Sequence, residues 1–347
     1  MGPKLVIRAP NHLGDCIMAI PMINETREVY PGATVTLLVP EALAELFDNN
    51  PAVDEIIRIP TEHVHGMIAV MKIKDLLAPH QFDIGYILPP SFGAAASFKL
   101  GGVKERIGYV ADGRRLLLSR PLPLSTPLNH QHRSLTYFDL LRRATQSPLD
   151  YVEPRLFLTQ EDTRRGMELL AGLGLETGAP YAVIAFQAVA ESRRWGIEKY
   201  IELARRLRKF HSFHIVLIGG AADQRLGDTF VQEASVGAIN LAGKTTLRES
   251  AAILASASIF VGNDSGPAHL AAAVGAPLVV ISGADDPQET SPISKRKRLV
   301  RLEELECIGC VKNKCPLKGK DFMRCMEDIT VDMVEGEIIR LLTERPS

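Results

Sequence analysis

The sequence predicts an α/β fold of two doubly wound domains, each a parallel sheet wrapped by helices. Short runs of β-branched and aliphatic residues alternate with helical patterns, which indicates parallel strands joined by helices. The pattern restarts near residue 180, and 347 residues suit two domains better than one. We expect domains at 1–174 and 175–330, then a C-terminal helix over 331–347 that is a candidate to pack back on the first domain.

The first domain is expected to open with a regular alternation of strands and helices. Residues 101–129 are rich in Gly, Pro and Arg, so short strands and loops are expected there. Thr159 suits the N-cap of a later helix and Gly174 its end. The expected strands are 4–8, 34–39, 55–59 and 82–88. The expected helices are 15–29, 42–47, 66–77, 135–144 and 160–173.

The second domain repeats the pattern. Its expected strands are 181–186, 214–218, 238–241, 259–261 and 278–281, with helices between them and a last helix over 331–343. The one dense basic run, 295–298, is expected to be a solvated loop, with an anionic surface or phosphorylated acceptor nearby as the alternative.

Composition limits the class of protein. With 46% hydrophobic and 23% charged residues, the chain is expected to be a folded, soluble protein. A formal charge of −1 offers no global reason to bind nucleic acid. The N-terminal apolar run is too short for a signal peptide, and no later run reaches the roughly 18 residues of a membrane span. We expect a cytoplasmic protein.

The segment "PNHLGD" directly follows the first expected strand, where open α/β sheets bind ligands. Asp15 at its end would repel a phosphate, but a carboxylate at a cleft can accept a proton from a substrate hydroxyl. Asp15 is therefore predicted to be a general base. The alternatives are that Asp15 is only a helix N-cap, or that His12 is the base.

The segment "QAVAESRRWG" follows the first strand of the second domain. Arg193 and Arg194 precede a helix, where planar guanidinium groups suit a diphosphate. Two exposed arginines at a helix start are the plainer alternative. Trp195, the only tryptophan, is expected to be a packing residue.

A third segment, "VGNDSGPAHLAAAVGAP", predicts an anion site. Ser265 suits an N-cap, Gly266 allows close backbone approach, and Pro267 suits the first helical turn. The N-H groups of such a turn bind phosphate, with His269 one turn further on. A Ser-His-Asp hydrolase is disfavoured, because Ser265 lacks the Gly-x-Ser-x-Gly elbow.

Four cysteines lie within nineteen residues in "CIGCVKNKCPLKGKDFMRC". In a reducing compartment this spacing favours a metal over disulfides, and four thiolates leave no open position for catalysis. A structural Zn or Fe site is therefore the hypothesis for Cys307, Cys310, Cys315 and Cys325.

Taken together, the segments resemble the bacterial ADP-heptose:lipopolysaccharide heptosyltransferases, glycosyltransferase family 9, over nearly the whole chain. The resemblance rests on "HLGD", "ILPPSFGAAASFKLGGVKERIGY" over 87–109, "SRRW" and "NDSGPAHLAAAVGAP". The second of these is most similar to type II members. The resemblance implies GT-B architecture, in which two Rossmann-like domains face a central cleft.

Site residues follow from the resemblance. The family's catalytic base falls on Asp15. Its donor-binding residues fall on Gln187, Ala188, Arg193, Arg194, Asp264, Ser265, Gly266 and His269. Family members often have Lys at position 193. They often have Pro-Gly-Ala or a similar sequence at 186–188, where this chain has Phe-Gln-Ala. Candidates for acceptor binding are His12, Ser91, Lys99, Arg114, Arg115 and Arg120.

The resemblance also implies a reaction: inverting transfer of L-glycero-D-manno-heptose from ADP-heptose to a Kdo-lipid A or heptosyl-Kdo-lipid A acceptor, with no cofactor needed for catalysis. It implies a monomer at the cytoplasmic face of the inner membrane, in peripheral contact through its acceptor. The alternatives are heptosyltransferase I or III, another family 9 acceptor, or a noncatalytic nucleotide-sugar-binding protein. An epimerase or dehydrogenase is disfavoured, because no Gly-x-Gly-x-x-Gly follows the first strand.

Overall fold

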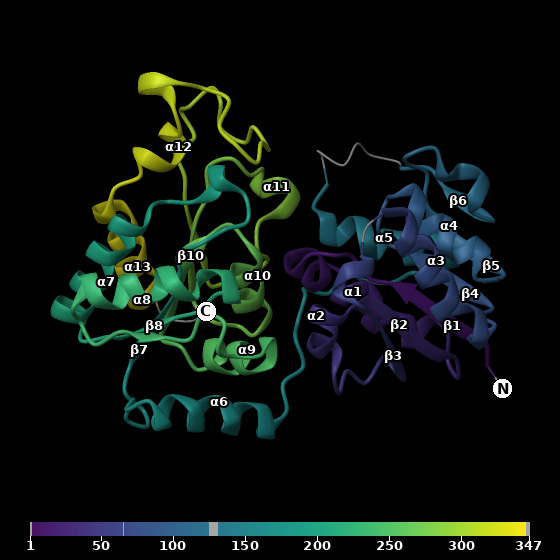
Figure 1. Cartoon of the computed structure of the whole chain (residues 1–347), viewed down its shortest axis with the longest axis horizontal. Helices are drawn as coiled ribbons and strands as arrows, with labels where there is room; N and C mark the ends of the chain where they lie inside the picture. The colour runs from purple at the N-terminus through teal and green to yellow at the C-terminus, as the bar shows by residue number, and fades with distance from the viewer. Residues whose placement is uncertain (1, 65, 125–130, 345–347) are drawn as a thin grey trace. The chain divides into compact units, whose positions relative to one another are not determined.

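The computed structural model of the chain describes residues 2–64, 66–124 and 131–344. The chain divides into two compact units, Met1–Phe157 and Leu158–Ser347. Each unit contains a six-stranded sheet whose neighbouring strands all pair in parallel, with helices around it (Figure 1). The predicted fold class, α/β with two doubly wound domains, is confirmed.

The sheet of the first unit has the order β3-β2-β1-β4-β5-β6. Its strands are β1 Lys4–Arg8, β2 Thr34–Pro40, β3 Glu55–Ile59, β4 Ile84–Ile87, β5 Glu105–Tyr109 and β6 Arg120–Leu122. Its helices are α1 Leu13–Val29, α2 Glu41–Ala44, α3 Gly66–Leu77, α4 Phe92–Leu100 and α5 Arg133–Thr145. Phe98, Leu77 and Phe82 are buried together beneath α3 and α4.

The sheet of the second unit has the order β12-β11-β10-β7-β8-β9. Its strands are β7 Tyr181–Ala185, β8 His214–Leu217, β9 Ile239–Asn240, β10 Ile259–Asn263, β11 Leu278–Ile281 and β12 Lys297–Val300. Its helices are α6 Gln160–Gly172, α7 Ile197–His211, α8 Gln224–Ala234, α9 Leu247–Ala255, α10 Gly266–Ala273, α11 Pro287–Thr290, α12 Arg324–Glu327 and α13 Val331–Thr343. Trp195, Tyr200 and Phe230 belong to its buried core.

Both sheets place their strands in the same sequential order, so the direction of winding reverses once in each. The reversal lies between β1 and β4 in the first sheet and between β7 and β10 in the second. Ligands of doubly wound sheets bind at the carboxyl ends of the strands beside such a reversal. A ligand-binding site is therefore expected at the loops that follow β1, β7 and β10.

Two elements differ from the sequence-based expectation. The basic run 295–298, expected to be a loop, overlaps β12, which pairs in parallel with β11 at the edge of the sheet. Its apolar alternation is weak because an edge strand has only one neighbour to pack beside. Residues 92–100, given no helix from the sequence, form α4, capped by the Ser91 hydroxyl, which accepts from Ala94 N at 3.3 Å.

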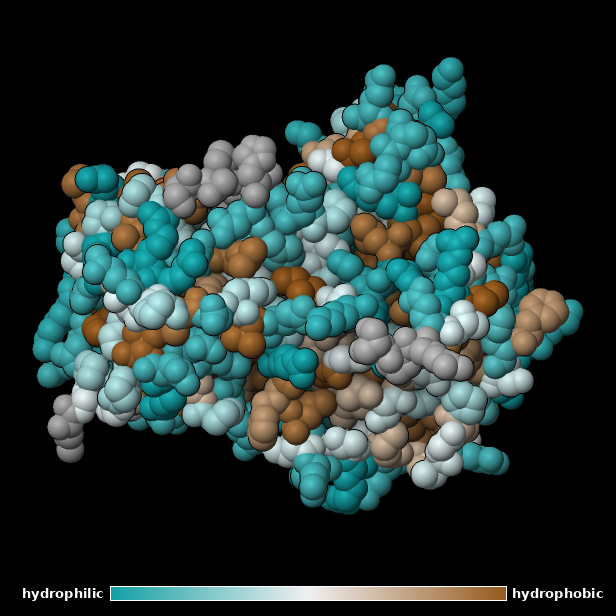
Figure 2. Space-filling view, turned by 180° about the vertical axis from the view of Figure 1, so that it is seen from behind, coloured by the Kyte–Doolittle hydropathy of each residue, from teal (hydrophilic) through white to brown (hydrophobic). Residues whose placement is uncertain are grey.

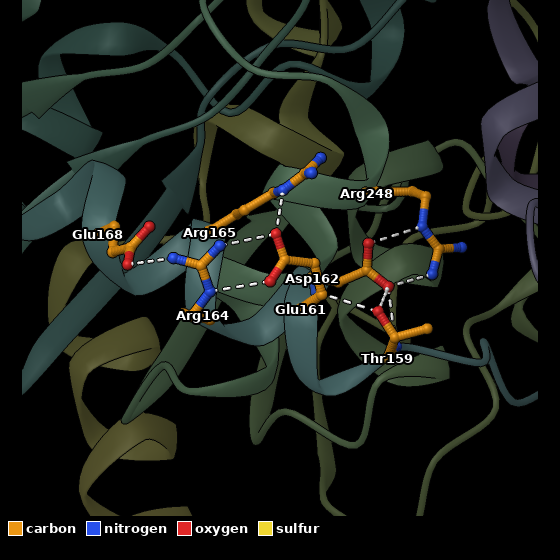
Figure 3. A network of polar contacts seen from close by, with 7 residues as sticks. All are labelled: Thr159, Glu161, Asp162, Arg164, Arg165, Glu168 and Arg248. Atoms are coloured by element: carbon orange, nitrogen blue, oxygen red, sulfur yellow. Dashed lines mark hydrogen bonds and ion pairs between the residues drawn. The ribbon is translucent and has the colours of Figure 1, made fainter.

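Helix α6 belongs to the second unit, whereas the sequence-based boundary at residue 174 assigned it to the first. Thr159 caps α6 as predicted, and Asp162 completes the capping box. The Asp162 carboxylate also receives two hydrogen bonds from Arg248 of α9, one of them 3.0 Å long (Figure 3). Gly166 lies so close to Ala252 of α9 that an added Cβ would be 2.8 Å away. Tertiary contacts with α9 thus decide where α6 belongs.

Helix α13, which the sequence made a candidate to pack on the first domain, is part of the second unit. Its Val334, Ile338 and Leu341 are buried in the core of the second unit, beside residues of β12 and α7. Helices α6 and α13 are thus both parts of one C-terminal unit.

The surface turned toward the viewer in Figure 2 is mainly hydrophilic, with hydrophobic residues interspersed. None of the helices in the described part of the chain combines the length and hydropathy that a membrane crossing requires.

Candidate active site

Asp15 lies in the first turn of α1, just beyond the carboxyl end of β1. Its Oδ1 atom accepts a hydrogen bond from Arg133 Nη1 at 3.0 Å and one from Tyr137 Oη at 3.3 Å, both from α5. The Asp15 side chain is 15% exposed, so the carboxylate is sheltered but reachable. A carboxylate with one oxygen held in this way can present its other oxygen to a ligand.

The simplest alternative, that Asp15 is only an N-cap, does not match the helix. Helix α1 begins at Leu13, and its N-cap position is His12, whose side chain caps no N-H group of the described residues. Asp15 sits two residues inside the helix. A first-turn carboxylate still gains from the helix dipole, but its hydrogen bonds go to α5.

Three hydrogen bonds fix the loop that precedes Asp15. Arg8 at the end of β1 is buried, and its guanidinium donates to the carbonyl of Ala9 and to Asn11 Oδ1, the latter at 2.5 Å. Burial lowers the pKa of Arg8 to about 10. The Cys16 thiol donates to the carbonyl of Pro10 at 3.2 Å. These bonds fix the backbone that leads to Asp15.

Of the predicted acceptor residues, His12 and Ser91 lie at the ligand edge of the first sheet. His12 is exposed and precedes α1, and Ser91 is exposed and follows β4. These two positions suit contact with an acceptor, although Ser91 also caps α4.

Arg114 has a different role from the one predicted. Its side chain is buried and donates to the carbonyls of Pro89 and Tyr109, the latter at 2.9 Å. Burial lowers its pKa to about 10. The geometry gives Arg114 a structural role, joining the loops after β4 and β5. Arg115 beside it is exposed.

Lys99 and Arg120 lie away from the ligand edge. Helix α4 runs back from the carboxyl end of β4 to the start of β5, so Lys99 in its last turn is near the amino ends of the strands. Arg120 begins β6 and pairs with Glu105, the first residue of β5, at 3.3 Å. It lines an open cavity of about 470 Å³ at that opposite edge. The structure therefore does not support acceptor contacts for these two residues.

In the second unit, Asp264 follows β10 and is 3% exposed. Its Oδ2 atom has no hydrogen-bond partner among the described residues. Burial raises its pKa to about 6, against the opposing effects of the Ser282 hydroxyl and nearby cations. The cations are Arg193, Lys297 and Arg301. A buried carboxylate with an open oxygen beside three cations is a polar group prepared for a ligand.

Arg193 ends a short 3-10 helix, Glu191–Arg193, and pairs with Asp285 at 2.5 Å. Arg194 is exposed and donates through Nε to the carbonyl of Ala188 at 2.8 Å. Ala188 is buried and Gln187 is half-buried in the loop after β7. The predicted donor-binding residues of this segment thus surround the carboxyl end of β7.

Helix α10 starts as predicted, with Ser265 at the N-cap position, Gly266 as the first helical residue and Pro267 next. The Ser265 hydroxyl does not cap the helix; it donates to the carbonyl of Asn263 at 3.3 Å. The first turn therefore has no side-chain cap among the described residues, which suits an anion. His269 is buried one turn further along.

Trp195 packs, as predicted, against Tyr200, with ring centroids 4.9 Å apart. Its backbone N-H and the Tyr200 hydroxyl both donate to Asn263 Oδ1, at 3.1 and 3.0 Å. Asn263 immediately precedes Asp264. The aromatic pair thus holds the end of β10 against the loop after β7.

The four cysteines differ in exposure. Cys307 is exposed, Cys310 and Cys315 are half-buried, and Cys325 is buried. Burial, and then the neighbouring thiols of the other three, raise the pKa of Cys325 to about 11. Within residues 2–64, 66–124 and 131–344, no group of three or more His, Cys, Asp or Glu side chains is arranged to hold a metal ion.

The sequence analysis missed several residues of these clusters. The predicted helix 135–144 contained Tyr137 but not Arg133, so the two were not placed on one face; α5 in fact begins at Arg133. Asp285 follows β11 in a small-residue turn, the same signal that identified Asp264. Lys297 was assigned to a loop.

Each unit thus has a doubly wound sheet with polar groups at its carboxyl edge: a carboxylate in the first, and cations with an uncapped helix in the second. This is the plan of glycosyltransferases of GT-B architecture. The model of glycosyltransferase family 9 (heptosyltransferase) matches residues 70–320, and the chain belongs to this family. The predicted resemblance is confirmed.

Individual proteins are similar over their full length. The chain is 27% identical to lipopolysaccharide heptosyltransferase 2 of Salmonella typhimurium, covering 98% of this chain and 99% of that protein. It is similar to the structure of Escherichia coli ADP-heptose lps heptosyltransferase II, with a TM-score of 0.79, 25% identity and 98% of both chains covered. A family 9 glycosyltransferase from Veillonella parvula has a TM-score of 0.84 at 20% identity, covering 99% of this chain and 98% of that one.

Proposed function

We propose that this protein transfers L-glycero-D-manno-heptose from ADP-heptose to a heptosyl-Kdo-lipid A acceptor, with inversion at the anomeric carbon. Family membership and full-length similarity to proteins named heptosyltransferase 2 support the donor and the acceptor class. The observation that carries the proposal is that each sheet has one half of the required chemistry at its ligand edge. One has the Asp15 carboxylate, which could act as a base, and the other has the uncapped start of α10, which could bind an anion.

In this proposal the second unit binds the donor. The diphosphate interacts with the first turn of α10 and with Arg193, which would exchange Asp285 for the phosphate. Asp264 faces a donor hydroxyl through its open Oδ2. Negative charge on the departing ADP is stabilised by these fixed cations and dipoles. No cofactor is part of this step.

The first unit activates the acceptor. An acceptor hydroxyl attacks the anomeric carbon of the heptose, its proton passes to Asp15, and the bond from that carbon to the diphosphate oxygen breaks. The products are the extended acceptor and ADP. Because the acceptor oxygen bonds to the anomeric carbon on the face opposite the departing diphosphate, the configuration inverts.

The decisive experiment measures transfer from ADP-heptose to Kdo-lipid acceptors bearing zero, one or two heptoses. We expect turnover only on the one-heptose acceptor. Turnover on the zero-heptose or two-heptose acceptor would instead indicate a type I or type III activity.

A second measurement tests the base. Asp15→Asn is expected to reduce kcat by about a hundredfold or more, because a positioned base contributes that much. ADP binding, followed by calorimetry, should stay within about twofold, because the donor site lies in the other unit. Near-wild-type turnover by the variant would show that another group is the base.

We also propose a structural zinc or iron ion at the four-cysteine segment. The Cys-x2-Cys-x4-Cys-x9-Cys spacing supports it. Because no three of these side chains in the described chain are arranged around one point, the ion would have to draw them together on binding. Metal analysis of protein purified without added metal tests this, with a Cys310→Ser, Cys315→Ser double variant as control. A metal-to-protein ratio near zero in the wild type would reject it.

Finally, we propose that the protein acts as a monomer at the cytoplasmic face of the inner membrane. Four large apolar side chains, 49% to 85% exposed, follow the carboxyl ends of β3 and β4, at the same edge as Asp15. They form the α3/α4 apolar surface: Met67, Ile68, Met71 and Phe92. Lys72, exposed on α3, adds positive charge suited to anionic lipid. Such a surface would contact the membrane that holds a lipid-linked acceptor.

A further inference from the structure

Helix α5 presents two hydrogen-bond donors to one oxygen of Asp15. Arg133 and Tyr137 are four residues apart, so they share a face of the helix. Arg133 Nη1 lies 3.0 Å and Tyr137 Oη 3.3 Å from Asp15 Oδ1. Oδ2 accepts no hydrogen bond from any residue that the structure describes.

Both donors are held in place by packing of α5 on α1. The Ser134 hydroxyl donates to the carbonyl of Met18 on α1 at 2.8 Å, and the Tyr151 hydroxyl donates to Ser134 Oγ at 2.9 Å. Tyr137 is 8% exposed. The two donors therefore extend from a helix that is fixed on α1, with Tyr137 buried and Arg133 34% exposed.

We propose that Arg133 and Tyr137 are positioning residues for Asp15: they fix its carboxylate in one rotamer and direct Oδ2 to the acceptor hydroxyl. This inference rests on the proposed function, in which Asp15 is the base. A positioned base must lie within hydrogen-bond reach of the proton that it removes, and a freely rotating carboxylate meets that condition only part of the time.

The neighbouring groups leave one charged and one neutral donor at Asp15. Burial raises the pKa of Tyr137 well above its usual value, so Tyr137 stays a neutral donor at working pH. Burial likewise raises the pKa of the Cys16 thiol far above neutral. On β1, Arg8 is bonded to Ala9 and Asn11, and His12 precedes α1 on the solvent side. Arg133 is thus the cation in direct contact with Asp15.

The test compares kcat and KM for four variants. Arg133→Gln is expected to lower kcat by about tenfold to a hundredfold, because the carboxylate loses a donor that holds it in place. Its KM for ADP-heptose should stay within about twofold, because the donor is proposed to bind to the other unit. Arg133→Lys should recover most of the lost kcat, since an ammonium group can donate to the same Asp15 oxygen. Tyr137→Phe should lower kcat by about threefold to tenfold with a similarly unchanged KM.

Arg142→Gln is the matched control, because Arg142 also belongs to α5 and pairs with an aspartate, Asp139, at 2.8 Å. Its kcat and KM should equal those of the wild type. If Arg133→Gln unfolds in thermal denaturation, Arg133→Lys and Tyr137→Phe carry the test.

The inference is overturned if Arg133→Gln, or in its place Tyr137→Phe, keeps kcat within about twofold of the wild type. This outcome differs from failure of the proposed function. If Asp15→Asn remains active, the base itself has been misassigned; if Asp15→Asn is inactive while the α5 variants are normal, only the positioning role is wrong.

Discussion

At the scale of single residues, the buried carboxylate of Asp264 lowers the stability of the folded protein. A carboxylate that is 3% exposed has lost most of its hydration, and the surrounding cations replace it only in part. The raised pKa means that the folded state holds the Asp264 proton more tightly than the unfolded state does. Stability from this group therefore falls as the pH rises from 3.8 to about 6.

Asp264→Asn is expected to raise the free energy of unfolding at pH 8, by up to about 3 kcal/mol, and to change it little at pH 4. The amide carries no charge to desolvate at either pH. Thermal unfolding from pH 4 to 8 measures the difference between variant and wild type.

Asp321→Asn, at an exposed carboxylate of the same unit, is the control and should show no comparable trend. A difference between Asp264→Asn and the wild type that is equal at pH 4 and pH 8 would contradict this account.

At the scale of elements, α6 shows how a tertiary contact decides the place of a helix. Its start was predictable from Thr159, since a capping residue acts within one turn. The unit in which α6 packs was not predictable, because Asp162 and Arg248 are 86 residues apart in the sequence. The hydrogen bonds from Arg248, with those from Thr159, hold the pKa of Asp162 well below its usual range. This ion pair therefore stabilises the second unit above about pH 4 and is lost as the pH falls further.

Arg248→Ala should lower the free energy of unfolding of the second unit by about 3 kcal/mol, because it leaves a largely buried carboxylate without its cation. Arg164→Ala is the matched control on α6. Arg164 is 57% exposed and pairs with Glu161 and Glu168 (Figure 3), so its loss should cost under about 0.5 kcal/mol. Urea unfolding measures both. Equal effects of the two changes would rule out a special role for Arg248.

At the scale of the whole molecule, two sheets with the same strand order place their polar groups after corresponding strands. Asp15 follows the first strand of one sheet, and Arg193 and Asp264 follow the first and fourth strands of the other. The α3/α4 apolar surface lies at the Asp15 edge of the first unit. An acceptor that was free in water would not need exposed apolar side chains such as Met67 and Phe92 beside the base, whereas a lipid-linked acceptor would.

A Met67→Gln, Phe92→Gln double variant is therefore expected to lose most binding to vesicles containing phosphatidylglycerol, measured by flotation, because the apolar contact with lipid is removed. Phe210→Gln is the control, since Phe210 is 64% exposed on α7 of the second unit. Equal flotation of both variants and the wild type would exclude this surface as the membrane contact.

Local patterns were sufficient for much of this protein. The strands 4–8, 55–59 and 278–281 and the helix 66–77 were predicted to the residue, because hydrophobic periodicity and capping act over a few positions. Candidate site residues could be named for the same reason: Asp15 and Asp264 follow apolar strands in turns of small residues. The sequence did not show which side chains contact Asp15 and Asp264.

The partners were decided only by tertiary structure. Arg133 meets Asp15 across 118 residues, Arg114 is buried among backbone carbonyls, α6 packs on α9, and the basic run joins a sheet as β12. Each depends on two segments far apart in the chain meeting in one fold, a relation that leaves no local periodicity in the sequence. A carboxylate after a strand can be read from its neighbours in sequence, whereas the arginine that directs it is found only once α5 packs on α1.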